Sequence, residues 1–469
     1  MNYISTRGTA PALAFDDVLL AGLARDGGLY LPESWPTLSA EKIRAFATMP
    51  FADIAVEVIH PFCGETISRA ELKRMAENAY ASFGDKSVAP LVKLAPGRYI
   101  LELFHGPTLA FKDVAMQLLA RLMDHVLEKR GARASIVGAT SGDTGGAAIE
   151  AFRSSKRVDV VILFPDGRVS DVQRRMMTTP TEPNVHAVAI KGTFDDCQAL
   201  VKGMFNDHAF RDRVQLSGVN SINWARIVAQ VTYYFAAASR LGAPDKAVSF
   251  AVPTGNFGDI FAGFVAKRMG LPIKQLIIAS NENDILPRTV ATGAYAMRGV
   301  VATSSPSMDI QISSNFERYL FEAANRDASV IHGLMGDLSA KQRFELGALW
   351  PVLKDDFAAA TASEQDVANC IRETKAKYGY VLDPHTACAV VAADRIGNGE
   401  TGDMVVLSTA HPAKFPDAIE AITGERPALP ARLSNLMTDK ERFDVIANDL
   451  ASVERYVERA VAASMKAAG

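Results

Sequence analysis

The stretch ASIVGATSGDTGGAAIEAFRSSKRVDVVILFP, residues 134–165, predicts the fold class of the chain. Residues 134–140 are an apolar run rich in β-forming residues, SGDTGG is a turn, AAIEAF has a helical pattern, and residues 158–165 are a second apolar run. Strands that are apolar at consecutive positions are buried on both faces, which is typical of parallel sheets covered by helices. The stretch therefore predicts a strand–helix–strand unit of an α/β fold.

The same alternation recurs further along the chain. VHAVAIKG (185–192) precedes a helical segment, AVSFAVPTGNFGDIFAGFVAKRMGLPIKQLIIAS (247–280) repeats strand, glycine turn, helix and strand, and DMVVLSTAHPAKF (403–415) is a strand followed by a polar turn. Two such blocks predict two open parallel-sheet α/β domains, with a cleft fed by loops at the carboxyl ends of the strands. Residues 281–402 mix helices with loops, and we assign them no chemistry.

A smaller, mainly helical domain is expected at the N-terminus. SRAELKRMAENAYASF predicts a helix in which Ser68 is the N-cap and Glu71 completes a capping box. We divide the chain into an N-terminal domain (1–92), a first α/β domain (93–218) and a second α/β domain (219–469).

The composition excludes several classes of function. The chain has 469 residues, 48% of them apolar, with 50 basic and 53 acidic side chains and a net charge of -3. This balance argues against nucleic acid or a membrane surface as a partner. No signal peptide, membrane-spanning run or metal-ligand spacing is found, so we expect a soluble cytoplasmic protein without a metal. For the oligomeric state, a monomer and a dimer are both left open. Its four cysteines are widely separated and suit a reducing compartment: Cys63, Cys197, Cys370 and Cys388.

Lys112 has an unusual position in ELFHGPTLAFKDVAMQLLARLMDHVL, residues 102–127. The apolar spacing predicts a helix that begins near residue 112, so the lysine lies at the positive end of the helix dipole. Leu109 and Phe111 add apolar surface, and both effects lower the pKa of an ammonium group. Such a lysine is a good amine nucleophile and can form a Schiff base. An ordinary solvated lysine is the alternative, and Asp113 can partly restore its charge.

Two glycine turns are candidate anion sites. In VPTGNFGD (252–259), Gly255 and Gly258 let backbone N–H groups converge at a helix N-terminus, which favours a phosphate over a plain turn. The turn matches neither nucleotide-binding glycine motif. GATSGDTGG (138–146) offers hydroxyl and amide groups for a carboxylate or a second phosphate, although Asp143 is equally explained as an N-cap.

A weaker signal lies in LSTAHPAKF, residues 407–415. A hydroxyl of Ser408 or Thr409 can bond a heteroaromatic nitrogen, and Lys414 adds a cation. A simply capped strand end is the favoured explanation when this motif is taken alone.

Together these motifs resemble a known family. HGPTLAFKD, TSGDTG, PTGNFGD and STAHPAKF occur in this order in threonine synthases, and YISTRG with GLARDGGLYLP is similar to the N-terminal domain of their bacterial and fungal branch. The resemblance covers essentially the whole chain. It implies the fold type II architecture of pyridoxal-phosphate enzymes and the conversion of O-phospho-L-homoserine and water to L-threonine and phosphate.

The resemblance also implies roles for individual residues. Lys112 matches the catalytic Schiff-base lysine, and Thr409 matches the hydroxyl that faces the pyridine nitrogen. The loop that holds the cofactor phosphate is matched by Gly255, Asn256, Phe257, Gly258 and Asp259. The loop that takes the substrate carboxylate is matched by Ser141, Gly142, Asp143 and Thr144. Our candidates for the substrate phosphate are Asn223, Arg226 and Lys414.

The chemistry of this reaction needs an electron sink for carbanion character, which the conjugated cofactor supplies, and a proton shuttle near neutral pH, which the lysine supplies. Three rival functions stay open. A serine or threonine dehydratase would eliminate at the β-carbon and needs no second phosphate pocket. A catalytically silent homologue would only bind phosphorylated metabolites. A purely structural α/β protein would bind no cofactor.

Overall fold

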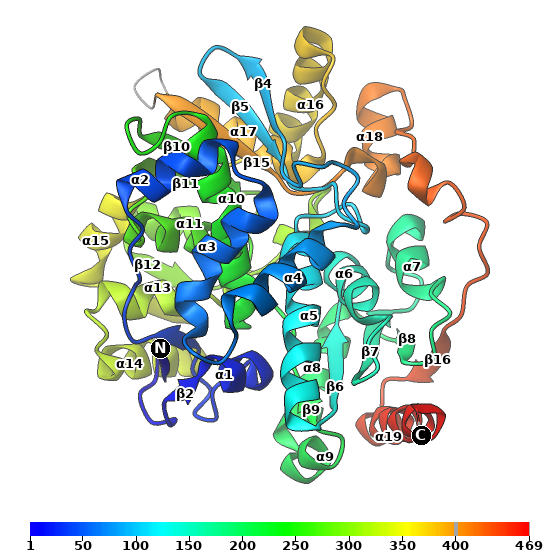
Figure 1. The fold of residues 1–469 in the computed structure, drawn as a ribbon. Coiled ribbons are helices and arrows are strands. Elements are labelled where there is room, and N and C mark those ends of the chain that lie inside the picture. The colour runs from blue at the N-terminus through cyan, green and yellow to red at the C-terminus, as the bar shows by residue number, and fades with distance from the viewer. Residues whose placement is uncertain (398–401, 469) are drawn as a thin grey trace.

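The computed structural model describes residues 1–397 and 402–468, and two parallel sheets organise it (Figure 1). The five-stranded sheet has the order β16-β8-β7-β6-β9, and each neighbouring pair is parallel. Its strands are β6 (Ala134–Ala139), β7 (Val158–Pro165), β8 (Val185–Lys191), β9 (Leu216–Ser217) and β16 (Asp444–Ala447). Its helices are α5 (Lys112–Arg130), α6 (Asp143–Phe152), α7 (Asp171–Thr178), α8 (Phe194–Asn206), α9 (His208–Arg213) and α19 (Leu450–Ala468).

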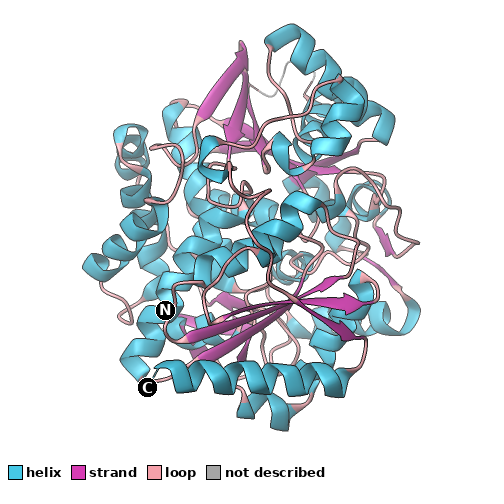
Figure 2. Ribbon diagram, turned by 90° about the vertical axis from the view of Figure 1, so that its right-hand side faces the viewer, coloured by secondary structure: helices cyan, strands magenta, loops and turns pink. Residues whose placement is uncertain are grey.

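Both faces of this sheet are buried, as the consecutive apolar residues predict. Ile136 and Val160 belong to the large core that α5 and α6 share, whereas Val137 and Val161 pack with residues of α8 and α19. Helix α19 lies along the outer side of the sheet (Figure 2). The stretch 134–165 thus forms β6, α6 and β7, the unit that the sequence predicted.

The six-stranded sheet has the order β14-β11-β10-β15-β5-β4 and is parallel except for the edge pair β4–β5. Its strands are β4 (Leu91–Ala95), β5 (Arg98–Glu102), β10 (Val248–Pro253), β11 (Ile273–Ser280), β14 (Phe357–Thr361) and β15 (Asp403–Ser408). Its helices are α10 (Trp224–Arg240), α11 (Gly258–Arg268), α16 (Glu364–Tyr378), α17 (Pro384–Ile396) and α18 (Pro416–Thr423).

Between β11 and β14 the chain forms a separate helical block. Its elements are α12 (Ile285–Thr292), β12 (Ala294–Ala296), α13 (Phe316–Ala323), α14 (Ala328–Lys341), β13 (Arg343–Glu345) and α15 (Leu349–Asp356). Short 3-10 turns lie at η2 (Pro306–Met308), η3 (Pro412–Lys414) and η4 (Ala431–Leu433).

The N-terminal region is mainly helical, as predicted, and adds a small antiparallel sheet. That sheet is formed by β1 (Asn2–Ser5), β2 (Leu13–Ala14) and β3 (Tyr30–Pro32). The helices are α1 (Phe15–Ala21), α2 (Ala40–Ala45), α3 (Phe51–Cys63) and α4 (Arg69–Tyr80), with a 3-10 turn at η1 (Phe46–Thr48). The predicted capping box of Ser68 and Glu71 is present at the start of α4.

The strand order departs from the contiguous division at residues 92/93 and 218/219. Strand β5 pairs with β15 and β4 pairs with β5, so both join the sheet of the C-terminal half, whereas β16 returns to pair with β8. Between α18 and β16 the chain runs along the outside of the molecule (Figure 1). Which strands pair depends on backbone hydrogen bonds and on the burial of apolar side chains. The positions of two strands along the sequence do not reveal whether they pair.

Helix α10 is the central helix of the molecule. Its residues 224–239 are all buried, and it packs against α3, α5 and α11. The Trp224 ring lies 6.0 Å from the Tyr3 ring and 5.6 Å from the Phe62 ring. The first turn of α10 is therefore inside the protein, which buries Arg226. Among the described residues, no helix combines the length and apolar character needed to cross a bilayer.

Candidate active site

Lys112 is the first residue of α5, as the helical spacing predicts. The loop before it is fixed by Asp113, whose carboxylate accepts hydrogen bonds from the Thr108 backbone N–H (2.8 Å) and hydroxyl (2.7 Å). The Phe111 N–H donates to the Thr409 carbonyl at 2.8 Å, which joins the HGPTLAFKD and STAHPAKF motifs. The chain thus brings two distant motifs together around one lysine.

The amine of Lys112 is buried, with 8% of the residue exposed. Its Nζ lies 4.9 Å from the centre of the Phe111 ring and donates to Asp143 Oδ2 at 3.1 Å. Burial lowers the pKa of Lys112; Asp143 opposes this effect, and the charges of Lys414 and Arg226 add to it. The neighbouring Asp113 makes its contacts with Thr108 instead, and burial raises the pKa of Asp113 to about 6.

Asp143 is the centre of the polar contacts around Lys112. It is the first residue of α6 and makes no capping hydrogen bond, so the alternative that it is merely an N-cap is wrong. Its carboxylate also accepts from Lys414 Nζ (2.6 Å), Gln173 Nε2 (2.9 Å) and Ser307 Oγ (3.2 Å). Burial alone would raise the pKa of Asp143, but Lys112 and Lys414 hold this pKa well below its usual range. Asp143 is therefore an ionised carboxylate that positions two amines.

Gly142 makes this arrangement possible. Its backbone φ is 144°, and a Cβ at this position would lie 2.5 Å from the side chain of Gln173. Gly142 therefore allows Gln173 to approach Asp143. The neighbouring Ser141 and Thr144 are partly exposed, and their hydroxyls make no hydrogen bond within the described part of the chain.

The turn between β10 and α11 has the form of an anion cradle. Its carbonyls face residues 313–315: Gly255 O accepts from Ser313 Oγ (2.6 Å), and Asn256 O accepts from the Asn315 N–H (3.0 Å). Phe257 adopts a left-handed backbone with φ 60°. Throughout the described residues, the N–H groups of positions 255–258 have no hydrogen-bond partner, which leaves four donors at the helix N-terminus.

This turn packs tightly against the loop of η2. A Cβ on Gly255 would lie 2.8 Å from the Ser307 carbonyl oxygen, so only glycine fits there. Ser307 in turn donates to Asp143, which holds Lys112. A short series of direct contacts therefore joins the buried amine to the anion cradle.

Asp259 supports the cradle from behind. Its Oδ1 accepts from the hydroxyls of Tyr233 (2.5 Å) and Tyr234 (3.0 Å) on α10, while its Oδ2 is buried without a described partner. Burial raises the pKa of Asp259 to about 7. A carboxyl group with this raised pKa is less ionised near neutral pH than an ordinary aspartate, which reduces the repulsion that it would exert on a bound phosphate.

We expect Asp259→Asn to change how stability depends on pH. The folded pKa of Asp259 lies above the unfolded value, so the folded state binds the additional proton and loses stability as pH rises from about 4 to about 7. At about 1.4 kcal/mol per pKa unit, this loss is at most about 4 kcal/mol. The Tm of Asp259→Asn relative to the parent protein should therefore be higher at pH 8 than at pH 5. Exposed Asp245, whose pKa is lowered by Arg44, is the control: Asp245→Asn should show no such gain.

Asn223 and Arg226 lie at the start of α10 but differ in their partners. Asn223 is the N-cap: its Oδ1 accepts from the Ala225 N–H (3.0 Å), and its Nδ2 donates to the carbonyls of Leu19 (3.0 Å) and Gly218 (3.2 Å). These bonds use its amide, so the structure does not support Asn223 as a phosphate ligand.

Arg226 is a buried cation without an acid partner. It is 3% exposed, and within residues 1–397 and 402–468 it donates only to the Val219 carbonyl at 3.3 Å and its Nε has no partner. No carboxylate among the described residues forms a salt bridge with it, and burial lowers its pKa to about 10. Burying an unpaired charge is costly, so this guanidinium has the properties of an anion-binding group near Lys112.

Lys414 and Thr409 complete the group of predicted residues. Lys414 is 1% exposed and donates to the Thr108 carbonyl (2.8 Å) as well as to Asp143. Thr409 is 5% exposed, and its hydroxyl has no hydrogen bond within the described residues. Of the predicted residues, the structure therefore brings together Lys112, Asp143, Thr409 and Lys414, with Arg226 close to the amine.

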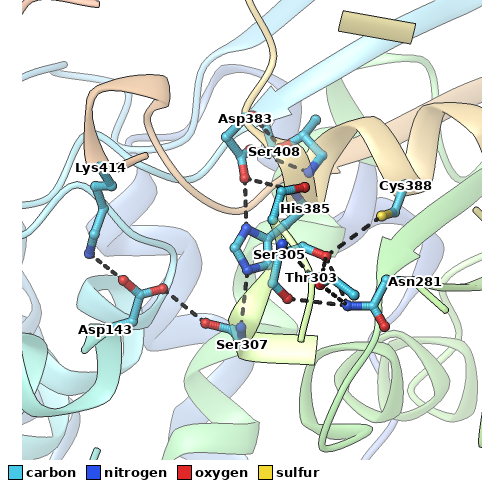
Figure 3. A network of polar contacts seen from close by, with 12 residues as sticks. Asp143, Asn281, Thr303, Ser305, Ser307, Asp383, His385, Cys388, Ser408 and Lys414 are labelled. Atoms are coloured by element: carbon cyan, nitrogen blue, oxygen red, sulfur yellow. Dashed lines mark hydrogen bonds and ion pairs between the residues drawn. The ribbon is translucent and has the colours of Figure 1, made fainter. Parts of the chain in front are cut away.

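Three contacting residues were absent from the prediction: Gln173, Ser307 and His385. Figure 3 shows Asp143 between Lys414 and Ser307, and His385 between Ser307 and Asp383. Ser307 lies in the loop TSSPSMD, where no motif marks one serine among several. The Asp-Pro-His sequence could have indicated a helix that begins beside His385, because Asp383 is the N-cap of α17 and Pro384 is its first residue.

The residues present fit pyridoxal phosphate (PLP). A buried amine with a lowered pKa suits condensation with its aldehyde, and four unpaired N–H groups at a helix N-terminus suit its phosphate. Within the described residues no cluster of side chains has the composition of a metal site.

Comparison with known proteins agrees with this chemistry. Residues 89–410 match the family described as pyridoxal-phosphate dependent enzyme, residues 2–80 match the threonine synthase N terminus, and residues 386–457 match the threonine synthase C-terminal family.

Individual relatives are similar over nearly their full lengths. The chain is 50% identical to threonine synthase of Pseudomonas aeruginosa, with 98% of each chain covered, and 39% identical to that of Saccharomyces cerevisiae, again with 98% of each covered. A PLP-bound threonine synthase structure from Brucella melitensis is 59% identical and superposes with a TM-score of 0.96, covering 98% of this chain and 99% of that one. The chain therefore belongs to the pyridoxal-phosphate-dependent enzymes and, among them, to the threonine synthase family.

Proposed function

We propose that this chain converts O-phospho-L-homoserine and water to L-threonine and phosphate, with PLP as its cofactor. The observation that carries the proposal is Arg226, a buried guanidinium with no carboxylate partner in the described residues, close to the buried amine of Lys112. The turn at 255–258 has four free N–H groups for one phosphate, so Arg226 is left for a second one. A substrate with its own phosphate group needs such a cation, whereas serine and threonine do not.

The proposed cofactor site joins three parts of the chain. Lys112 would hold the aldehyde end, the N–H groups of residues 255–258 would hold the phosphate, and the Thr409 hydroxyl would serve the ring nitrogen. When bound, PLP supplies a conjugated ring that stores the electron density left when a proton departs from the substrate. Asp259 acts from behind the cradle through Tyr233 and Tyr234, instead of contacting the phosphate.

The substrate is proposed to lie between the α6 turn and α10. Ser141 and Thr144 have hydroxyls available for the substrate carboxylate, and the backbone of Gly142 donates instead to Thr140 Oγ1 at 2.9 Å. Asp143, which the resemblance placed among the substrate ligands, is now proposed to orient Lys112 and Lys414 instead. Arg226 is the candidate for the substrate phosphate. Lys414, which the contact with Asp143 holds in the same site, is proposed to assist Arg226 in binding this phosphate.

Lys112 is the proposed proton carrier. Its lowered pKa makes the neutral Nζ amine more available than that of an ordinary lysine, which suits the successive removal of protons at Cα and Cβ. The departing phosphate is a second base at the same place. A substrate analogue with a phosphonate that cannot leave should therefore bind and stop before water is added.

The activity test is a phosphate-release assay with O-phospho-L-homoserine, coupled to detection of L-threonine. Stoichiometric phosphate and threonine support the proposal. Formation of 2-oxobutanoate from threonine, without turnover of phosphohomoserine, would instead identify a dehydratase, and binding of phosphohomoserine without any product would identify a silent homologue.

We further propose a cytoplasmic location. Cys63, Cys197, Cys370 and Cys388 are buried free thiols, which suits a reducing compartment.

A further inference from the structure

We propose that His385 is a positioning residue: its ring holds the Ser307 turn against both the anion cradle and Asp143. The inference concerns how the site is assembled, and it rests on the proposed function only in taking the 255–258 cradle as the PLP phosphate site. Neither His385 nor Ser307 contacts Lys112, so each acts through other groups.

The ring of His385 is fixed in one orientation. His385 is the second residue of α17, it is 3% exposed, and its ring centre lies 4.9 Å from that of Phe415. Asp383 is fully buried, and its Oδ1 lies 2.9 Å from both His385 Nδ1 and the His385 backbone N. An aspartate in this place accepts hydrogen bonds, so Nδ1 carries the proton and Nε2 is left as an acceptor.

The acceptor nitrogen meets Ser307. The Ser307 backbone N–H donates to His385 Nε2 at 3.3 Å (Figure 3). The other polar groups of Ser307 point to the two parts of the site. Its hydroxyl donates to Asp143 at 3.2 Å, and its carbonyl oxygen lies 2.8 Å from the position that a Cβ on Gly255 would take. Ser307 on η2 therefore contacts the cradle beside the six-stranded sheet, Asp143 beside the five-stranded sheet, and His385.

A neutral acceptor suits this position better than a charged one. Asp143 lies beside Ser307 and holds Lys112 and Lys414, so a carboxylate in place of the imidazole would compete for these amines. A buried N–H without an acceptor would in turn be costly, and the Ser307 turn would move to find one. The imidazole satisfies this N–H without adding charge.

Three variants separate this role from general stability. In His385→Gln an amide oxygen can reach the Ser307 N–H. His385→Asn can keep the contact with Asp383 but is too short to reach Ser307, and His385→Leu removes both. The readouts are the Kd of PLP for the cofactor-depleted full-length protein, followed by absorbance, and the Tm of the same samples.

We expect the Kd for PLP to rise about tenfold or more in His385→Asn and His385→Leu, and to stay within about threefold in His385→Gln. Ser307→Ala keeps the backbone N–H and loses only the hydroxyl, so it should leave the Kd unchanged and lower kcat/KM. If Asn, Leu and Gln variants all lower Tm but bind PLP like the parent, the positioning role is overturned. PLP affinity is measured without substrate, so failure of the parent protein to use phosphohomoserine would refute the proposed function separately.

Discussion

Lys112→Ala should abolish the visible absorption band that PLP gains in its site and lower turnover by about 10⁴-fold. The amine is the group that condenses with the cofactor aldehyde and the group that carries the proton, and Lys414 is held by the Thr108 carbonyl and Asp143 away from that role. Phosphate release from phosphohomoserine and the absorption spectrum of the purified protein measure the two effects.

The fold should survive this change. Removing a buried amine relieves its desolvation, and Asp143 keeps Lys414, Gln173 and Ser307 as partners. Lys129→Ala, an exposed lysine near the end of the same helix, is the matched control and should leave colour and rate unchanged. A Lys112→Ala protein that stays coloured and active would show that another residue holds the cofactor.

Arg226→Met should weaken turnover of phosphohomoserine without destabilising the protein. The substitution removes one long hydrogen bond to the Val219 carbonyl and no salt bridge, and it also removes the cost of burying a charge. We therefore expect the free energy of unfolding of the unliganded protein to rise by on the order of 1 kcal/mol. The ion pair between a buried cation and the substrate phosphate contributes much more to the binding free energy of the substrate. Its loss should therefore lower kcat/KM by about a hundredfold or more. Steady-state kinetics and Tm measure the two quantities.

Arg318→Met is the matched control for this prediction. Arg318 is also fully buried, but it donates to the carbonyls of Tyr30 (3.0 Å) and Ile222 (2.6 Å) and to the Asn315 side chain. Its loss leaves these acceptors unpaired, so Arg318→Met should lower Tm. If Arg226→Met also lowers Tm and leaves kcat/KM unchanged, Arg226 is a structural residue and the substrate-phosphate assignment is wrong.

Much of the fold was predictable because local pattern and tertiary structure agree. The apolar runs and glycine turns of 134–165 and 247–280 form β6–α6–β7 and β10–α11–β11, and the helix at Lys112 begins at the predicted residue. The comparisons confirm the predicted family, the fold type and the cofactor. The exchange of β4, β5 and β16 between the two sheets was not predictable, because strand partners are chosen across long sequence distances.

The candidate site shows the same limit at the level of side chains. Asp143 was ambiguous between a cap and a ligand because its role depends on Lys414 and Ser307, which are 271 and 164 residues away along the chain. Asn223 was a candidate for the substrate phosphate, but its side-chain amide is used by the backbone of α10 and α1. The motifs therefore contain residues that the structure brings together, whereas the partners of these residues required the structure.

The most direct test of the central claim is reduction of the purified enzyme with borohydride, which fixes PLP to its lysine, followed by peptide mass mapping. We expect the pyridoxyl group on the peptide that contains Lys112. Labelling of Lys414 or any other lysine in its place, or no labelled peptide from a coloured protein, would contradict it.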